Sequence, residues 1–400
     1  MTTWFVPGRV EVLGKHTDYA GGRSLICATD LGVTATVTDV LRPAGGRFVS
    51  AVSDASPESV TLGDGYGEPP VGHWGNYVAT VVSRLEADFG PLAPCHIEVT
   101  SDLPLASGMS SSSALLCAVA LALADHHGLT GSAAWLSAIT TREDLAGYLA
   151  CIENGSSFKQ LTGRAGVGTH GGSEDHTAMM CGRAGRLSVF SFSPIRHETD
   201  VALPSGTVFV VAVSGVLSEK TGAALATYNQ DSQVASRLLA KWQSATGRTD
   251  PTLGAALASA PDAMARLFSH VKSYNGDAAR LRQFRAESFE YVPAATDALA
   301  AGDLVEFGAV VDRSMALAVS DLRNQVPETI HLAAAARRLG AHAASAFGAG
   351  YGGSVWALVD EESAEGFAAD WLAGYLERFG RRDGAIALVV RPSAAARRLA

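Results

Sequence analysis

A chain of 400 residues can bury roughly three quarters of the surface that its unfolded form exposes, and its length predicts two or three domains. Hydrophobic residues make up 47% and charged residues 18% of the chain, which excludes a disordered protein and favours an α/β or α+β fold. The formal net charge of -9 at pH 7 argues against non-specific binding of nucleic acid, so we expect no nucleic-acid partner.

The cysteines and the apolar runs bear on the compartment. The five cysteines show no CxxC spacing and stand mostly in apolar runs, which favours free thiols in a reducing compartment over disulfides or a zinc site. Residues 1–6 lack the basic leader of a signal peptide, and no stretch reaches the ~20 apolar residues of a membrane span. We therefore expect a cytoplasmic protein with no membrane partner.

The first hundred residues show the alternation of apolar and polar side chains that is typical of strands. This pattern occurs at residues 33–38 and again at 95–100. Between these two segments, residues 73–78 lead into an amphipathic stretch that ends near Gly90. The second strand comes directly before a serine-rich turn, so strand, turn and helix are expected to follow one another.

The serine-rich turn at residues 104–120 is the most informative stretch of the chain. It places Gly108 and four consecutive serines before an apolar helix that is expected to run from about Ser111 to Gly128. A helix N-terminus has unpaired backbone N–H groups and a partial positive charge, so it attracts anions such as phosphate. An ordinary serine cap on a core helix has the same composition. The interpretation as a phosphate site therefore depends on support from elsewhere in the chain.

The remaining segments alternate between glycine-rich loops and regular elements. A helix is expected over residues 132–154, then a loop rich in Gly, Ser and Thr at 155–172. The run Gly-Gly-Ser-Glu-Asp-His at 171–176 crowds two carboxylates and an imidazole behind a glycine pair. Strands are expected at 186–192 and 207–213, mostly helices at 219–340, and finally a glycine-rich turn at 347–354 that leads into an apolar strand at 355–359.

Three motifs carry a resemblance to a known family. They are the run PGRVEVLGKHTDYAGG at residues 7–22, the serine-rich turn and the late glycine-rich turn. In these motifs and in their order the chain resembles the GHMP small-molecule kinases, and within them the galactokinase and N-acetylgalactosamine kinase branch. The resemblance implies an α+β, two-domain fold with the active site in the cleft between the domains. We place these domains at residues 1–200 and 201–400.

The resemblance also implies an activity and its cofactors. The activity would be transfer of the ATP γ-phosphoryl group, with Mg²⁺, to the anomeric hydroxyl of galactose or a related aldose. Asp175 matches the catalytic base of the family and Arg9 matches an arginine beside that base. The other implied residues are His16, Asp18 and Tyr228 with Lys15, Glu11 and Glu174 at the sugar, Trp74 and Tyr77 near adenine, Ser107, Gly108, Ser110, Ser111, Ser112 and Ser113 at the phosphates, and Ser111 and Glu153 at the metal.

The chain departs from the family at several of these positions. Lys15 stands where the family has a glutamate that contacts galactose, Glu11 replaces an asparagine and Glu174 a methionine. A lysine there would suit a carboxylated sugar such as galacturonate, whereas Glu11 or Glu174 could instead neutralise it within the protein. A further alternative is a regulator that binds sugar and ATP without catalysis. The expected partners are thus a sugar and ATP, and the expected assembly is a monomer or homodimer.

Overall fold

The computed structural model describes all residues except 42–46, 71, 105–107, 217–222, 272–275 and 400. Within these residues, nine strands form one large sheet, whose main path follows the order β13-β1-β2-β5-β3-β4. Strands β6 and β12 pair with β2, and β7 pairs with β6. The bounds of the nine strands are β1 Thr2–Leu13, β2 Arg23–Asp39, β3 Phe48–Ser53, β4 Ser56–Gly63, β5 Cys95–Ser101, β6 Arg186–Ser191, β7 Arg196–Ala202, β12 Pro392–Ser393 and β13 Arg397–Arg398.

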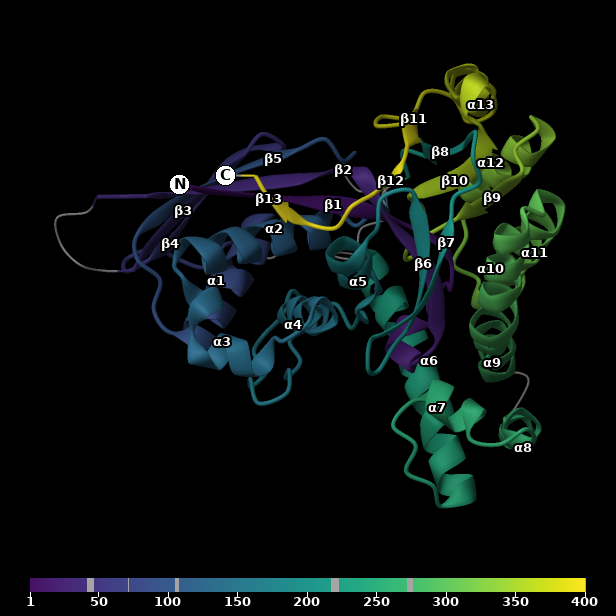
Figure 1. The fold of residues 1–400 in the computed structure, drawn as a ribbon, viewed down its shortest axis with the longest axis horizontal. Helices are drawn as coiled ribbons and strands as arrows, with labels where there is room; N and C mark the ends of the chain where they lie inside the picture. Colours follow the sequence, from purple (N-terminus) through teal and green to yellow (C-terminus); the bar gives the residue numbers. More distant parts are fainter. Residues whose placement is uncertain (42–46, 71, 105–107, 217–222, 272–275, 400) are drawn as a thin grey trace.

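Helices of the first half cover one face of the large sheet (Figure 1). Helix α2 packs against β1 and β2 on one side and against α1, α4 and α5 on the other. Its sequence is apolar all round because it is enclosed on all sides, and eleven of its sixteen residues are buried. The helices of this layer are α1 Gly75–Phe89, α2 Ser111–His126, α3 Ala133–Ala138, α4 Arg142–Asn154 and α5 Glu174–Cys181.

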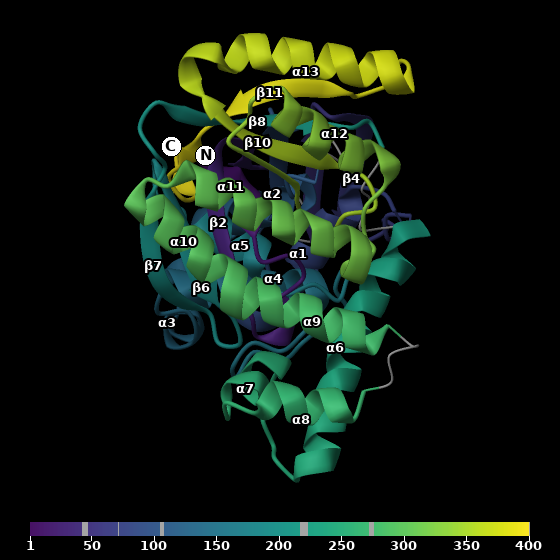
Figure 2. The same cartoon turned by 90° about the vertical axis from the view of Figure 1, so that its right-hand side faces the viewer.

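A second sheet has four antiparallel strands in the order β11-β8-β10-β9. Helices α12 and α13 pack against it (Figure 2). All seven residues of β8 are buried, and alternate side chains such as Val210 and Val211 belong to two different hydrophobic cores. The strands are β8 Thr207–Val213, β9 Ala343–Ala346, β10 Ser354–Asp360 and β11 Ile386–Val390, and the helices are α12 Pro327–Arg338 and α13 Ala364–Phe379.

The remaining helices come between β8 and β9 of the second sheet along the chain. Figure 2 shows α9, α10 and α11 running across the face that is turned toward the viewer, with α7 and α8 below them. No helix in the described ranges is both long enough and apolar enough for a membrane crossing. The bounds are α6 Ala223–Thr246, α7 Leu253–Ala258, α8 Ala263–Ser269, α9 Asp277–Ala286, α10 Val292–Ala301 and α11 Leu304–Leu317.

Most of the predicted elements are confirmed. Strands β2, β5, β8 and β10 contain the predicted segments, and α1 and α2 end within two residues of the glycines expected to follow them. The single helix expected over 132–154 is wrong, because two helices, α3 and α4, occupy this range. Ile139 is extended, and the Thr141 hydroxyl caps α4 by accepting a hydrogen bond from the Asp144 backbone N–H.

Several strands of the large sheet have no counterpart in the sequence analysis, among them β1, β3, β4, β7, β12 and β13. Strand β7 is mostly exposed and lacks the apolar alternation by which a strand is detected. Strands β12 and β13 bring the end of the chain back to β2 and β1, so both termini lie on the same sheet (Figure 1). The domain boundary near residue 200 stays a prediction.

Candidate functional site

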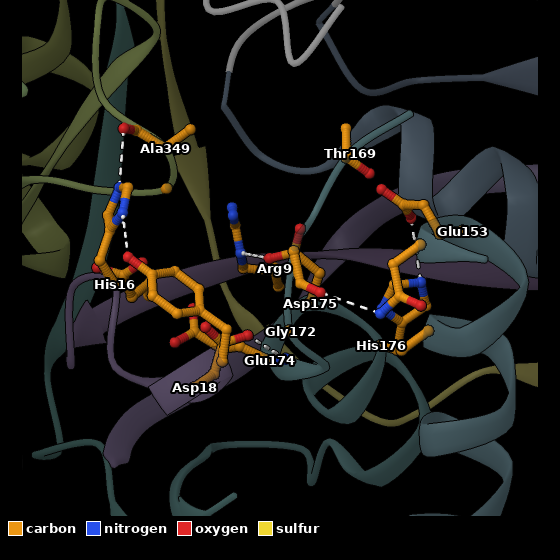
Figure 3. Close-up of a pocket in the computed structure, with 16 residues that line it drawn as sticks. Arg9, His16, Asp18, Glu153, Thr169, Gly172, Glu174, Asp175, His176 and Ala349 are labelled. Carbon is orange, nitrogen blue, oxygen red and sulfur yellow. Dashed lines mark hydrogen bonds and ion pairs between the residues drawn. The ribbon is translucent and has the colours of Figure 1, made fainter. Parts of the chain in front are cut away.

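The first turn of α5 presents Asp175 to a polar cavity, which is lined by Arg9, Glu11, His16, Asp18, Glu174 and Asp175 among others (Figure 3). Carboxylates are favoured in the first turn of a helix because the N–H groups there carry partial positive charge. The preceding Gly172 lies so close to Asp18 that a Cβ atom would stand 2.2 Å from its Oδ2. The glycine pair therefore allows the loop to enter α5 against the cavity wall.

Arg9, on β1, connects the cavity to the serine-rich turn. Its Nε donates a hydrogen bond to Asp175 Oδ1 at 2.8 Å, and its Nη1 donates to the Gly108 carbonyl. The guanidinium lies 5.8 Å from the centre of the Phe347 ring, and a Cβ atom on Gly348 would approach its Nη2 to 3.2 Å. One buried arginine thus contacts the carboxylate of α5, the serine-rich turn and the late glycine-rich turn.

Charge in the cavity is strongly mixed. Burial alone would lower the pKa of Arg9, but the neighbouring carboxylates of Asp175, Glu174 and Glu11 raise it above its ordinary value. Burial, together with the charges of Glu11 and Asp18, raises the pKa of Glu174 well above its ordinary value. Arg9 therefore stays charged beside Asp175 and can hold that carboxylate as an acceptor.

The serines of the turn divide into two pairs. Ser110, whose φ of 59° is left-handed, donates from Oγ to Asp175 Oδ2 at 2.5 Å, and Ser113 Oγ lies 3.5 Å from the same oxygen. Ser111 and Ser112 instead line a second cavity of about 400 Å³. Ser110 and Ser113 therefore position the Asp175 carboxylate, while Ser111 and Ser112 face the space in which an anion could meet the N-terminus of α2.

Two aromatic residues complete this second cavity, which we call the aromatic cavity. Trp74 and Tyr77 both line it, and the Trp74 indole N–H donates to the Glu58 carbonyl at 3.1 Å. Gly108 has a φ of +77°, and a Cβ atom there would lie 3.7 Å from the Phe347 carbonyl oxygen, in ordinary contact with the late glycine-rich turn. Ser107 lies outside the described residues.

His16 and Asp18, which the resemblance places at the sugar, both line the polar cavity. His16 hydrogen-bonds through Nδ1 to the Tyr19 hydroxyl and through Nε2 to the Ala349 carbonyl, each at 3.0 Å (Figure 3). Asp18 accepts from the Glu174 backbone N–H at 3.0 Å, and burial raises its pKa. The roles of His16 and Asp18 toward a sugar stay predictions. The side chain of Tyr228, also expected at the sugar, lies outside the described part of the chain.

Lys15 is turned away from the polar cavity. It is 1% exposed and is absent from the cavity lining. Its ammonium donates to Ser314 Oγ at 3.1 Å, and Ser314 in turn donates to Glu287 Oε1. The structure thus places this charge behind the cavity, among side chains of α11 and of the turn that follows α9.

Glu11 and Glu174 do line the polar cavity. Glu11 lies two residues beyond Arg9 on β1, so their side chains share one face of the strand. Glu174 Oε2 accepts a hydrogen bond from Ser24 Oγ at 2.5 Å. Both carboxyl groups therefore lie on the wall from which Lys15 is withdrawn.

Glu153, at the end of α4, supplies the carboxylate that suits a metal ion. It lines the polar cavity, and its Oε2 lies 3.1 Å from His176 Nε2 (Figure 3). The described residues contain no group of three or more His, Cys, Asp or Glu side chains that could hold a metal by themselves. A carboxylate and a serine hydroxyl nevertheless fit Mg²⁺, which takes oxygen ligands and keeps several positions for water and phosphate.

Some residues of the site could not be expected from the sequence. Arg280, on α9, is buried and donates to the His16 carbonyl and, at 3.1 Å, to the Tyr19 hydroxyl. No motif surrounds it, so no sequence signal marks it. Ala349, by contrast, belongs to the late glycine-rich turn, one of the three motifs that carry the resemblance.

Comparison with known proteins bears on the family of this chain. Family models match it at residues 2–39 (galactokinase galactose-binding signature), 76–157 (GHMP kinases N terminal domain) and 295–376 (GHMP kinases C terminal). The chain belongs to the GHMP kinase family. The three matches lie in the order of the motifs and include β1, β2, α2 and α4, from which Arg9, the serines and Glu153 project.

Several relatives of this GHMP kinase match it along most of its length. The galactokinase of Roseiflexus sp. (strain RS-1) is 26% identical over 382 residues, which cover 94% of this chain and 88% of the relative. The galactokinase of Pyrococcus furiosus is 26% identical over 389 residues, with coverage of 97% and 96%.

Solved structures show the same fold. The structure of Lactococcus lactis galactokinase complexed with galactose matches with a TM-score of 0.80 at 21% identity, covering 100% of this chain and 95% of that one. Methanococcus jannaschii mevalonate kinase matches with a TM-score of 0.60 at 13% identity and 98% coverage of both chains. The α+β architecture expected from the resemblance is thereby confirmed as the GHMP kinase fold.

Proposed function

We propose that this GHMP kinase is a galactokinase-like sugar kinase, which transfers the γ-phosphoryl group of ATP to the anomeric hydroxyl of galactose or a related aldose. The observation that carries the proposal is the position of Arg9. It joins Asp175 in the polar cavity to Gly108 of the serine-rich turn. A sugar hydroxyl bound at Asp175 and a phosphate bound at the serine-rich turn would therefore both lie next to the Arg9 guanidinium.

Each side chain has a role in this transfer. The Asp175 carboxylate accepts the proton of the attacking hydroxyl, while Ser110 and Arg9 orient it. The Arg9 guanidinium also stabilises the negative charge on the transferring phosphoryl group, which is the main demand of this reaction on a protein. Trp74 and Tyr77 bind the adenine, and Ser111 and Ser112 at the N-terminus of α2 bind the phosphates.

Mg²⁺ would be held by Glu153 and Ser111 together with the nucleotide. When bound, the ion neutralises charge on the ATP phosphates. Glu153 comes from α4 and Ser111 from α2, which pack against each other and against α5. This packing supports a metal between the Asp175 side and the phosphate side of the site.

The relatives and the cavity favour a neutral sugar over a carboxylated one. Lys15, the residue that suggested galacturonate, donates to Ser314 and does not line the cavity. The relatives that match 94% to 97% of the chain carry the name galactokinase, and a galactose-binding signature matches residues 2–39. We therefore propose galactose, or a neutral aldose close to it, as the substrate.

A coupled ADP-release assay tests the proposal. Purified protein is incubated with ATP, Mg²⁺ and one sugar at a time: galactose, N-acetylgalactosamine, arabinose, galacturonate or glucuronate. We expect ADP formation with galactose or another neutral sugar and a sugar 1-phosphate as product. Binding of sugar and ATP by calorimetry without any ADP formation would instead establish a regulator.

The cysteines bear on the compartment in which the reaction takes place. All five cysteines are free thiols and are buried or half-buried, which fits a reducing compartment, and we propose the cytoplasm. A monomer or homodimer stays our prediction for the assembly.

A further inference from the structure

Three side chains at which this chain departs from the family motifs are neighbours in the structure. They are Glu11 and Lys15, near the start of the chain, and Glu174, on α5. Lys15 is turned behind the polar cavity toward Ser314, whereas both glutamates line that cavity. The positive charge is therefore buried in the protein, and the carboxyl groups face the ligand.

Glu11 presents a carboxyl group at this wall. The residue is 3% exposed, and its Oε1 is enclosed by protein atoms. The carboxyl group lies beside that of Glu174 and in the field of Lys15 and Arg9. Because Glu11 lines the polar cavity, its carboxyl group can accept a hydrogen bond from a ligand hydroxyl there.

Glu174 is held in place from two sides. Ser24 donates to its Oε2 at 2.5 Å, and its backbone N–H donates to Asp18 at 3.0 Å. Because Glu174 precedes Asp175 on the same helical turn, the Glu11–Glu174 pair lies next to the carboxylate that faces the reacting hydroxyl. The pair is therefore within the space that the sugar would occupy.

The charge of the cavity opposes an anionic ligand. Of its described lining residues, five carry a carboxyl group, and Arg9 is the one lysine or arginine. That guanidinium is already engaged by Asp175 and Gly108. A sugar carboxylate would meet a wall of acidic side chains and no lysine or arginine besides Arg9, whereas a sugar hydroxyl would find an acceptor.

We propose that Glu11 is a specificity-determining residue: its carboxyl group accepts a hydrogen bond from a hydroxyl of a neutral aldose, and the Glu11–Glu174 pair excludes carboxylated sugars. This inference rests on the proposed sugar kinase activity. In this arrangement Glu11 provides the carboxylate contact at the sugar, and Lys15 neutralises part of the charge from behind.

Two substitutions at Glu11 separate this role from a structural one. Glu11→Met keeps the length of the side chain but removes both oxygens, and Glu11→Gln keeps one acceptor oxygen. We expect Glu11→Met to raise the KM for galactose about 10- to 100-fold, since a hydrogen bond to a charged group is lost, and Glu11→Gln to give a smaller rise. The KM for ATP should stay within about twofold of the wild-type value.

A matched control is Glu328→Gln. Glu328 has a half-buried carboxyl group and pairs with Arg382 at 2.6 Å, but it lies on α12, outside the cavity. The kinetic constants of the Glu328→Gln variant should equal those of the wild type. Melting temperatures of all variants show whether each one is folded, and Glu11→Gln serves as the test if Glu11→Met does not fold.

Sugars that lack one hydroxyl each identify the donor. For the wild type, the kcat/KM of one deoxygalactose should be lower than that of galactose by about the same factor by which Glu11→Met lowers the kcat/KM of galactose. Glu11→Met should then lower the kcat/KM of that deoxygalactose only a little further. Galacturonate should be used at least about a hundredfold less well than galactose by the wild type. An unchanged galactose KM in Glu11→Met, or preferred use of galacturonate, would overturn the inference. No ADP formation with any sugar would overturn the proposed function itself.

Discussion

Replacing Asp175 by Asn tests the base in the proposed transfer. The carboxylate accepts from Arg9 Nε at 2.8 Å through Oδ1 and from Ser110 Oγ at 2.5 Å through Oδ2. An asparagine amide is neutral, so the charge-assisted bond with Arg9 is lost, at a cost of about 1.5 to 3 kcal/mol in stability. The amide also cannot accept a proton, so kcat should fall about 10²- to 10⁴-fold. At 1.36 kcal/mol per factor of ten, this loss is about 3 to 5 kcal/mol of transition-state stabilisation.

The assay is ADP release for kcat, with calorimetry for ATP binding. ATP affinity should stay close to that of the wild type, because Asp175 lies in the polar cavity and the adenine residues line the aromatic cavity. Asp200→Asn is the matched control, since Asp200 also pairs with an arginine, Arg183, but lies on β7 outside both cavities. A kcat within about fivefold of the wild type in Asp175→Asn would refute the assignment of the base.

Three further predictions concern the nucleotide, the metal and the pH dependence. Trp74→Ala should raise the KM for ATP about tenfold and leave the KM for sugar unchanged, because stacking on a base is lost, and equal rises in both would contradict this role. Glu153→Gln should raise the half-saturating Mg²⁺ concentration by about tenfold, whereas an unchanged Mg²⁺ titration would exclude Glu153 as a ligand. Burial raises the pKa of Glu11 from its ordinary 4.5 to about 7, although the positive charges of Lys15 and Arg9 act to lower it. The contribution of Glu11 to the free energy of unfolding is therefore present below about pH 4.5 and is lost as the pH rises through 7. The melting temperature of Glu11→Gln should therefore rise relative to that of the wild type between pH 5 and pH 8. A constant difference between the two melting temperatures would contradict the raised pKa.

The sequence was most informative where local chemistry decides the structure. The helix after the serine-rich turn begins at Ser111 as expected, and it ends at His126, two residues before a left-handed Gly128. Apolar runs such as β8 were also recognised, because a strand buried on both faces has few polar residues. Strand β7 was missed because it is an exposed strand, whose stability comes from pairing with β6 rather than from its own pattern.

The residue types of the site were visible in the sequence, but their contacts were not. Asp175 and Arg9 stood in separate motifs, and 166 positions separate the two residues that form the ion pair. Arg280 supports His16 from α9 without any surrounding motif. Such contacts depend on how β1, α5 and α9 pack, which no local pattern encodes.

The sequence alone determined the family and the chemistry available to the site, because glycine turns, serine caps and adjacent carboxylates act over a few residues. Only the tertiary structure decided which way each charge points. Lys15 and Glu11 are four residues apart, yet one is turned toward Ser314 and the other lines the polar cavity. That difference arises because burying a charge is costly unless a partner is at hand, and the hydrogen-bond partner of Lys15, Ser314, comes from the distant helix α11 and donates in turn to Glu287.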